Sequence, residues 1–280
     1  MTKLKTIIGE SFCHMKKGDP GCPDGDGHEC KGPYNVGEVV DGKYTYTDNP
    51  DGYTDYLISH CYFDNTGIKP EDSDEALPVV WGANATIRNC YIKNWGKGLL
   101  LGNGDEPAEM RKNMTITIEN CIFDGNGRRN PYAQGVTVYM KNCIIKNWGK
   151  TFYRKSHAVR VADDARLFIE DCIFIQDKFV QTNLFNLLQD CYWQVDSFKN
   201  LWNFFYPGPM RGVYTENGGV IEKLEHCYKN KFWICFGKKD PSPMTATEAK
   251  IKMDEIASQV PHSPEEAALF KTIFKNQFTE

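Results

Sequence analysis

The sequence predicts an all-β solenoid of stacked coils that ends in a C-terminal helical tail. The main observation is a six-residue motif, apolar-polar-polar-Cys-apolar-apolar, which recurs at steps of about 20 to 30 residues, as solenoid coils do. Its six copies contain Cys61, Cys90, Cys121, Cys143, Cys172 and Cys191. Helical periodicity does not separate the copies, which argues against a fold of alternating strands and helices.

Residues 1–53 read as an N-terminal loop-rich segment, because they contain many Gly, Asp and Pro residues and few apolar runs. Lys5 to Gly9 could form one short strand. Cys13, Cys22 and Cys30 lie here, around Asp24, Asp26 and His28. This group is consistent with a metal site of oxygen or Cys/His ligands, although its spacing matches no strong zinc or calcium pattern. The other interpretation is a loop with one disulfide.

Residues 54–240 contain the repeats and form the predicted β domain. The repeated cysteines should point inward, one above another. They would act either as a metal or redox ladder or as a column of buried thiols that pack as small apolar groups, and we favour free buried thiols. The tetrapeptide Asn-Trp-Gly-Lys follows two of the copies, at 94–97 and 147–150.

Residues 241–280 form the predicted helical tail, which should pack on the β domain. Pro241 and Pro243 interrupt the chain, and two capping boxes follow at Thr245–Glu248 and Ser263–Glu266. In each predicted helix the apolar residues share one face. These residues are Ala249, Met253, Ile256 and Val260 in the first helix, and Leu269, Phe270, Ile273 and Phe274 in the second.

Composition limits the classes of partner. The formal net charge is −4, so the chain has no basic footprint for nucleic acid. It has no apolar run long enough to cross a bilayer, and its first ten residues lack a signal-peptide core. The protein would then be cytosolic, or its chain would begin after a removed signal. Eleven cysteines leave at least one without a partner in the chain.

Two motifs resemble those of the pectate lyase family, which includes the pectin lyases. The first is Lys-x-x-x-x-Gly-x-x-Asp, present as Lys97 to Asp105. The second is Arg-x-Pro, present as Arg129-Asn130-Pro131, eight residues past Cys121. A strand similar to the one that follows in the family spans Val136 to Cys143. The resemblance implies a right-handed parallel β-helix for residues 54–240.

The family cleaves polygalacturonate by β-elimination, so the resemblance implies a lyase that acts on pectate or another acidic polysaccharide. It implies that Arg129 is the base and that Lys97 binds the uronate carboxylate. A guanidinium holds its proton tightly, so activity should rise at alkaline pH. Other substrate-binding residues would be Arg128, Gln134, Asp105 and Tyr132. The resemblance also implies a secreted monomer.

The sequence departs from the family where calcium would bind. Where the family has an Asp-His pair, this chain has Ser59-His60. Where the family has a second Asp, this chain has Pro78, and Gln134 stands near the position of the family's second arginine. Asp74, Asp72 and Glu75 are the remaining candidate ligands, which predicts weak calcium dependence at most.

Two further possibilities remain open from the sequence. One is a pectin lyase that acts on methyl-esterified polymer, whose carboxyl groups need less neutralisation by cations. Its aromatic cleft could be formed by Trp81, Trp95, Trp148 and Tyr132. Trp95 and Trp148 could instead pack inside the coils. The other possibility is a non-catalytic carbohydrate-binding β-helix, which the lost carboxylates favour.

Overall fold

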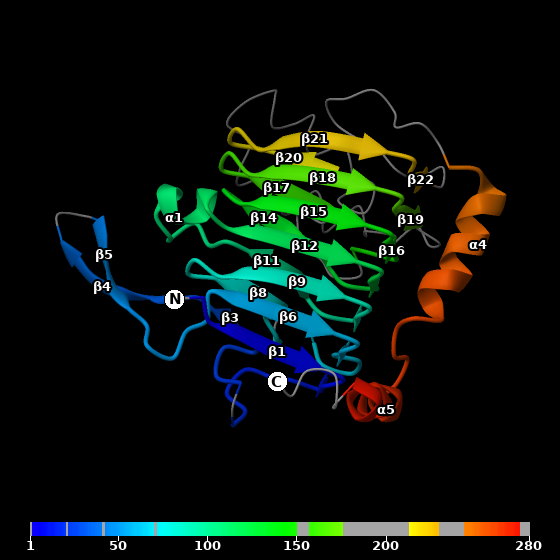
Figure 1. Cartoon of the computed structure of the whole chain (residues 1–280), viewed down its shortest axis with the longest axis horizontal. Helices are drawn as coiled ribbons and strands as arrows, with labels where there is room; N and C mark the ends of the chain where they lie inside the picture. Colours follow the sequence, from blue (N-terminus) through cyan, green and yellow to red (C-terminus); the bar gives the residue numbers. More distant parts are fainter. Residues whose placement is uncertain are drawn as a thin grey trace, which may run out of the picture.

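The protein is a right-handed parallel β-helix with helices at its C-terminal end, which confirms the predicted fold class. The computed structural model describes residues 2–20, 22–40, 43–69, 72–149, 157–175, 213–229 and 244–274. Each coil passes through three parallel sheets, here called sheets 1, 2 and 3, and successive coils stack in register (Figure 1).

Each sheet takes one strand from each coil in chain order. Sheet 1 contains β1 (Leu4–Ile8), β6 (Asp55–Ser59), β9 (Asn84–Arg88), β12 (Thr115–Glu119), β15 (Thr137–Lys141), β18 (Arg166–Glu170) and β21 (Val220–Glu225). Sheet 2 contains β2 (Ser11–Cys13), β7 (Tyr62–Asp64), β10 (Tyr91–Lys93), β13 (Ile122–Asp124), β16 (Ile144–Lys146), β19 (Ile173–Ile175) and β22 (Tyr228–Lys229). Sheet 3 contains β3 (Cys30–Lys31), β8 (Glu75–Val80), β11 (Lys97–Leu101), β14 (Tyr132–Gln134), β17 (Val159–Ala162) and β20 (Val213–Thr215).

The repeated motif forms the corner between sheet 1 and sheet 2. Each such corner has two residues, as in His60 and Cys61 between β6 and β7. The first corner residue adopts a left-handed backbone conformation, with φ between 47° and 63° in the seven described corners. Glycine, asparagine, aspartate and histidine tolerate this conformation best, and these residue types occupy it. They are Gly9, His60, Asn89, Asn120, Asn142, Asp171 and His226.

The second corner residue is a buried cysteine in six of the seven described corners, and Glu10 in the first. Cys61, Cys90, Cys121, Cys143, Cys172 and Cys227 are fully buried and free, which confirms the prediction of a column of buried thiols. Each S–H donates within its own corner, as from Cys121 Sγ to the Glu119 carbonyl at 3.2 Å. Cys191 lies outside the described residues, and Cys227 continues the column in the last coil.

The region 1–53 contributes strands to the solenoid as well as loops. The predicted strand at Lys5 is β1, which pairs in parallel with β6, while β2 and β3 join the other two sheets. The solenoid therefore begins near Leu4 and not at residue 54. Between β3 and β6 the chain forms an antiparallel hairpin of β4 (Tyr34–Val40) and β5 (Lys43–Asp48). Cys13, Cys22 and Cys30 are free, so the disulfide considered for this region is not formed.

Two C-terminal helices pack on the solenoid, as predicted: α4 runs along the stack of coils, and α5 lies across it at the first coil (Figure 1). Helix α4 (Ala246–Ala257) begins at the Thr245–Glu248 capping box and buries Ala249 and Ile256. Its apolar face covers the outer face of sheet 2, where Ile122, Ile144 and Ile173 are buried. A short helix, α1 (Ala108–Lys112), lies between β11 and β12.

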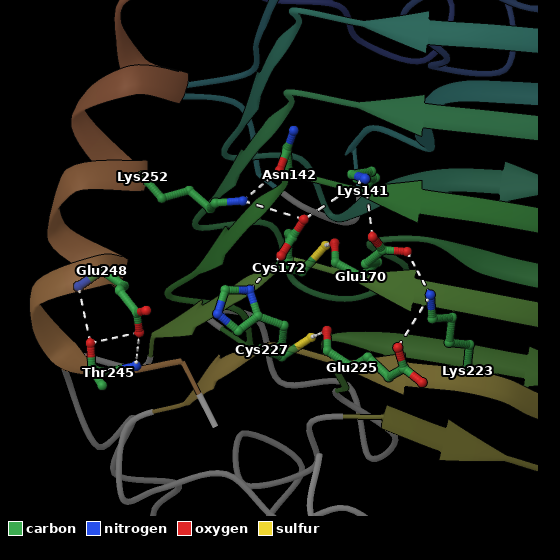
Figure 2. A network of polar contacts seen from close by, with 12 residues as sticks. Lys141, Asn142, Glu170, Cys172, Lys223, Glu225, Cys227, Thr245, Glu248 and Lys252 are labelled. Atoms are coloured by element: carbon green, nitrogen blue, oxygen red, sulfur yellow. Dashed lines mark hydrogen bonds and ion pairs between the residues drawn. The ribbon is translucent and has the colours of Figure 1, made fainter. Parts of the chain in front are cut away.

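Polar contacts also fasten α4 to the coils (Figure 2). Lys252 donates to Asn142 Oδ1 at 2.7 Å and lies 3.5 Å from Asp171, so it contacts two corner residues on successive coils. Beside them, alternating charges on sheet 1 form a ladder across three coils, in which Lys141 and Lys223 bind Glu170 at 3.0 and 2.8 Å. These ion pairs are exposed and should contribute little individually to stability.

Helix α5 (Pro264–Phe274) differs from the prediction of one buried apolar face. Phe270 and Phe274 pack on the His60 ring, with centroids 4.4 and 4.8 Å away, but Leu269 and Ile273 are more than half exposed. Leu269 and Ile273 are exposed because α5 packs closely on the first corner, where a Cβ on Gly9 would lie 2.2 Å from the Ala267 carbonyl oxygen. This approach turns the Ala267 face toward the solenoid and the Leu269 face toward solvent.

The cysteine column predicts a graded response to changes of side-chain volume. Cys121→Leu should lower the free energy of unfolding by about 1–3 kcal/mol, because the added carbons must fit between two buried thiols. Cys121→Ala should cost less, about 1 kcal/mol, for a small cavity. Urea unfolding followed by circular dichroism measures both, with half-buried Cys13→Ala as the control. A Cys121→Leu protein as stable as the wild type would show that the column is not close-packed.

Candidate functional site

The candidate site lies where the chain enters sheet 3, and the coil register assembles it. Glu75 and Lys97 are the first residues of β8 and β11 and are paired in register. Arg128, one coil further on, forms a parallel bridge with Lys97. Arg129 follows with φ 63°. Three successive coils therefore bring the predicted catalytic residues Lys97 and Arg129 together with Glu75, although 54 residues separate Glu75 from Arg129.

Buried carboxylates hold the two cations in place. The Lys97 ammonium contacts Asp74 and lies 3.4 Å from Glu75 Oε1, while the Arg129 guanidinium contacts the same Glu75 oxygen. Glu75 is 6% exposed, and its backbone N–H donates to Asp26 Oδ1 at 2.9 Å. The side chains of Lys97 and Arg129 keep 19% and 15% of their surface exposed, so both cations reach solvent.

The crowding of charges in a partly dry site shifts several pKa values toward neutrality. Burial raises the pKa of Glu75 to about 7, although Arg129 acts to lower it. Burial also raises the pKa of Asp26 to about 6. The pKa of Lys97 is lowered to about 7, first by burial and then by the neighbouring guanidiniums of Arg129 and Arg128. Three groups of this site therefore change protonation state near pH 7.

Tyr132 joins the site to the next coil. Its ring lies 5.1 Å from the Arg129 guanidinium and 4.2 Å from that of Arg160, which pairs with Tyr132 across sheet 3. Arg160 in turn contacts Glu216. Lys97, Arg129 and Arg160 thus form a row of cations on consecutive coils, and neighbouring strands are about 4.8 Å apart.

Asp26, Asp74 and Glu75 form an acidic group that could bind a metal ion, since one oxygen of each lies within 4.8 Å of the others. Oxygen donors are suited to calcium, but calcium takes six to eight of them. Lys97 contacts Asp74, and Arg129 contacts Glu75, so the chain's own cations already neutralise the group. These residues do not fit a resident calcium ion. Predicted ligand Asp72 lies outside the group and pairs with Lys16 at 3.8 Å.

Two predicted substrate-binding residues lie at the C-terminal ends of the sheet 3 strands, away from the candidate site at their N-terminal ends. Gln134 is the last residue of β14 and donates to Asp163 Oδ2 at 3.1 Å. Asp105 lies beyond the end of β11 and is exposed. The structure therefore brings Arg128 and Tyr132 to Lys97 and Arg129, but not Gln134 or Asp105. Trp95 and Trp148 are fully buried and pack inside the coils, so they line no cleft.

Sequence reasoning missed Arg160 and did not place Asp26 beside Glu75. The sequence suggests Asp26 as a ligand of a separate N-terminal metal site, with Asp24 and His28, because nothing in it shows that this segment folds against Glu75. Arg160 stands two residues before Ala162, at the register position of Tyr132. Aligning the coils on their sheet 3 strands, instead of on the repeated cysteines, would have placed Arg160 opposite Tyr132.

Comparisons with known proteins agree with the fold and go no further. Residues 75–187 match the family model described as "Right handed beta helix region". Domains of this kind are often found in carbohydrate-active proteins. A search of curated proteins gave no match. The helices among the described residues are too short or too polar to cross a membrane.

The ion pairs predict how this site responds to calcium. Calcium should leave the melting temperature of the wild type nearly unchanged, because Lys97 and Arg129 already neutralise the carboxylates. Lys97→Ala should remove the cation that contacts Asp74 and one of the two that contact Glu75, and so create a calcium-dependent increase in melting temperature, equivalent to about 2.7 kcal/mol at a hundred times the dissociation constant. Thermal unfolding with calcium or with chelator measures this, with exposed Lys112→Ala as the matched control. An equal increase in the wild type would contradict the assignment.

Proposed function

We propose that the protein is a polysaccharide lyase that cleaves pectate or a related polyuronide by β-elimination. The observation that carries the proposal is that the coil register places Lys97 and Arg129 next to each other. Both cations lie against the same oxygen, Oε1, of buried Glu75. Both side chains reach solvent at the entrance to sheet 3, where a polymer can approach.

The chemistry requires a base and a cation near one sugar. Elimination removes the proton on C5 of a uronate residue. The electron pair left at C5 forms the C4–C5 double bond while the C4–O bond breaks, and the departing chain end takes up a proton. The neighbouring carboxylate makes C5 poorly acidic, so cations that neutralise this carboxylate stabilise the transition state.

In the proposed mechanism Arg129 takes the C5 proton and Lys97 binds the uronate carboxylate. Contact with Glu75 and stacking on Tyr132 restrict the Arg129 side chain, which a general base needs. Arg128, next to Lys97 across the coil bridge, adds positive charge. A bound uronate would favour the charged form of Lys97 above the pH at which the free site loses its proton.

The row of cations also supports a polymeric anion as the substrate. A polyuronide carries a carboxylate on each sugar, and Lys97, Arg129 and Arg160 stand on consecutive coils. We therefore assign to Arg160 the carboxylate of a sugar next to the reacting one. Calcium has no part in the mechanism, because the carboxylates that would hold it are already paired.

A second candidate function is non-catalytic binding of carbohydrate. The observation that favours it is that Lys97, Arg129 and Arg160 each contact a carboxylate of the same chain. This pairing leaves the site close to neutral, which suits a methyl-esterified or neutral polymer better than pectate.

Substitution of the base separates these functions. Arg129→Ala and Arg129→Lys should each lower kcat by on the order of 10²–10⁴ and leave the fold intact, since lysine lacks the planar guanidinium and its reach. Lys97→Ala should lower kcat and raise KM together, because a carboxylate clamp acts in the ground state as well. The measurement is the ultraviolet absorbance of unsaturated uronides released from polygalacturonate and from methyl-esterified pectin.

The controls are circular dichroism and Arg166→Ala, which removes an exposed arginine from sheet 1. Wild-type activity should increase toward alkaline pH, because a guanidinium must lose a proton to act as a base. A wild type that is inactive on both polymers would favour the binding function, and near-native turnover by Arg129→Ala would remove Arg129 from the mechanism.

Chelation should change activity little. We expect the wild type to keep most of its turnover in excess EDTA, since Lys97 and Arg129 supply the positive charge at the site. The same absorbance assay tests this, with added magnesium and with added calcium as separate arms. Complete loss of turnover in EDTA that calcium alone restores would show that a calcium ion completes the site.

A further inference from the structure

One turn of the solenoid contains a residue that does not suit its backbone. The strands of sheet 3 align Val79 with Leu101, Leu101 with Ala133, Ala133 with Val161, and Val161 with Thr215. Two residues further along, four coils place a residue with positive φ at the start of the turn toward sheet 1. These residues are Trp81 (φ 60°), Gly135 (φ 69°), Asp163 (φ 55°) and Asn217 (φ 46°).

Tryptophan is the exception among these four. Glycine, aspartate and asparagine adopt left-handed backbone at little cost, whereas a bulky side chain in this region is an outlier. In the described chain fourteen residues other than glycine have positive φ, and all except Trp81 and Arg129 are Asn, Asp or His. Arg129 lies in the candidate site. Outliers of this kind mark functional positions, so Trp81 indicates a second one.

The surroundings of Trp81 fix this turn tightly. A Cβ on Gly32 would lie 1.9 Å from the Trp81 carbonyl oxygen, so two backbones meet there without space for a side chain. The carboxylate of buried Glu106 interacts with the backbone N–H groups of Trp81 and Gly82, and it accepts the Asn103 N–H at 2.8 Å. The neighbours therefore hold Trp81 in a conformation that its own side chain disfavours.

The hairpin of β4 and β5 adds aromatic rings to the Trp81 side chain. The Tyr46 ring lies 6.3 Å from the Trp81 ring at 46°, and the Tyr46 hydroxyl donates to the Asp105 carbonyl at 3.3 Å. Tyr34 is 37% exposed and packs against Gly82, where a Cβ would lie 2.9 Å from its ring. Figure 1 shows the hairpin and α1 on the same side of the solenoid, opposite α4. Trp81 itself remains partly exposed.

The charges near these rings favour a neutral ligand. The Tyr46 hydroxyl contacts the backbone of Asp105, whose side chain is exposed, so a negative charge lies near the rings. Arg111, the cation that interacts with Glu106, is 10% exposed and pairs with Asp163 at 3.3 Å. A uronate carboxylate would meet Asp105, whereas the hydroxyls of a neutral sugar can donate to it. The apolar face of a pyranose ring can stack on a partly exposed indole.

We propose that Trp81, Tyr46, Tyr34 and Asp105 form a second carbohydrate site, which binds a neutral sugar residue. It is separate from the Lys97–Arg129 site, because β11 alone spans about 13 Å between its first and last residues. It does not depend on lyase activity, since a purely carbohydrate-binding β-helix would use it in the same way.

The test replaces Trp81 with a residue that the other coils use in this turn. Trp81→Asn should abolish retardation of the protein in native gels that contain neutral galactan or glucomannan. Its melting temperature should stay unchanged or increase, because asparagine suits the left-handed backbone. Tyr46→Ala should weaken retardation, and Trp81→Phe should keep part of it. Exposed Tyr139→Ala on sheet 1 is the matched control and should migrate like the wild type.

Two results would overturn the proposal. One is equal migration of the wild type in the presence and absence of both neutral polysaccharides. The other is a Trp81→Asn protein with a lower melting temperature, which would show that the indole serves to anchor the hairpin. The Arg129→Ala protein should still be retarded in gels that contain neutral polysaccharide. The second site can therefore be tested even if the lyase proposal fails.

Discussion

The architecture depends on the two-residue corner between sheets 1 and 2. Its first residue adopts a left-handed backbone that turns the chain, and in six of the seven described corners its second residue is a cysteine, small and apolar enough to stack inside the coil. Asn120 and Cys121 show the two roles side by side. A one-residue insertion or deletion in this corner would move the side chains of the following sheet 2 strand to the other face. The corner therefore sets the register on which the rest of the molecule relies.

That register explains how distant residues come to share one site. Glu75, Lys97 and Arg128 are far apart in the sequence, but each stands where its coil enters sheet 3, so stacking alone makes them neighbours. The solenoid body buries Glu75 and leaves the two cations at the surface. Strand positions orient Glu75 and Lys97, whereas Asp74 and Arg129 lie in the connections just before β8 and β14.

The sequence predicted the fold well, because the repeat that encodes it is local. The corner motif, the column of thiols and the capping box at Thr245 could all be read within a few residues. The last corner was missed because Lys229 occupies the position at which the other copies have an apolar residue, and this hid Cys227. The exposure of Leu269 was missed for a different reason. An apolar face on a helix predicts burial, but the contact of α5 with Gly9 decides which residues are buried.

The site could be predicted only in part, since it combines the register with packing between segments. Lys97, Arg129 and Glu75 could be named from motifs. Asp26 could not, because its place beside Glu75 depends on how a Gly-rich loop folds back onto sheet 3. The ion pairs of Lys97 and Arg129 also required coordinates, and they change the chemistry, since they balance the charge of Asp74 and Glu75, two of the carboxylates that the sequence offers as weak calcium ligands.

The corner and the connections to sheet 3 differ in what they allow evolution to change. Every described corner between sheets 1 and 2 has two residues, while the connections between sheets 2 and 3 vary, for example from residues 94–96 to residues 14–29. The connections from sheet 3 back to sheet 1 vary too, since the β4–β5 hairpin and α1 are inserted there. Insertions therefore occur at both ends of the sheet 3 strands, one of which borders the Lys97–Arg129 site, and not in the described corners between sheets 1 and 2. A lineage could acquire new specificities there by lengthening one connection at a time, with the supporting coils unaltered. The same asymmetry offers protein engineers an insertion point next to the reactive groups.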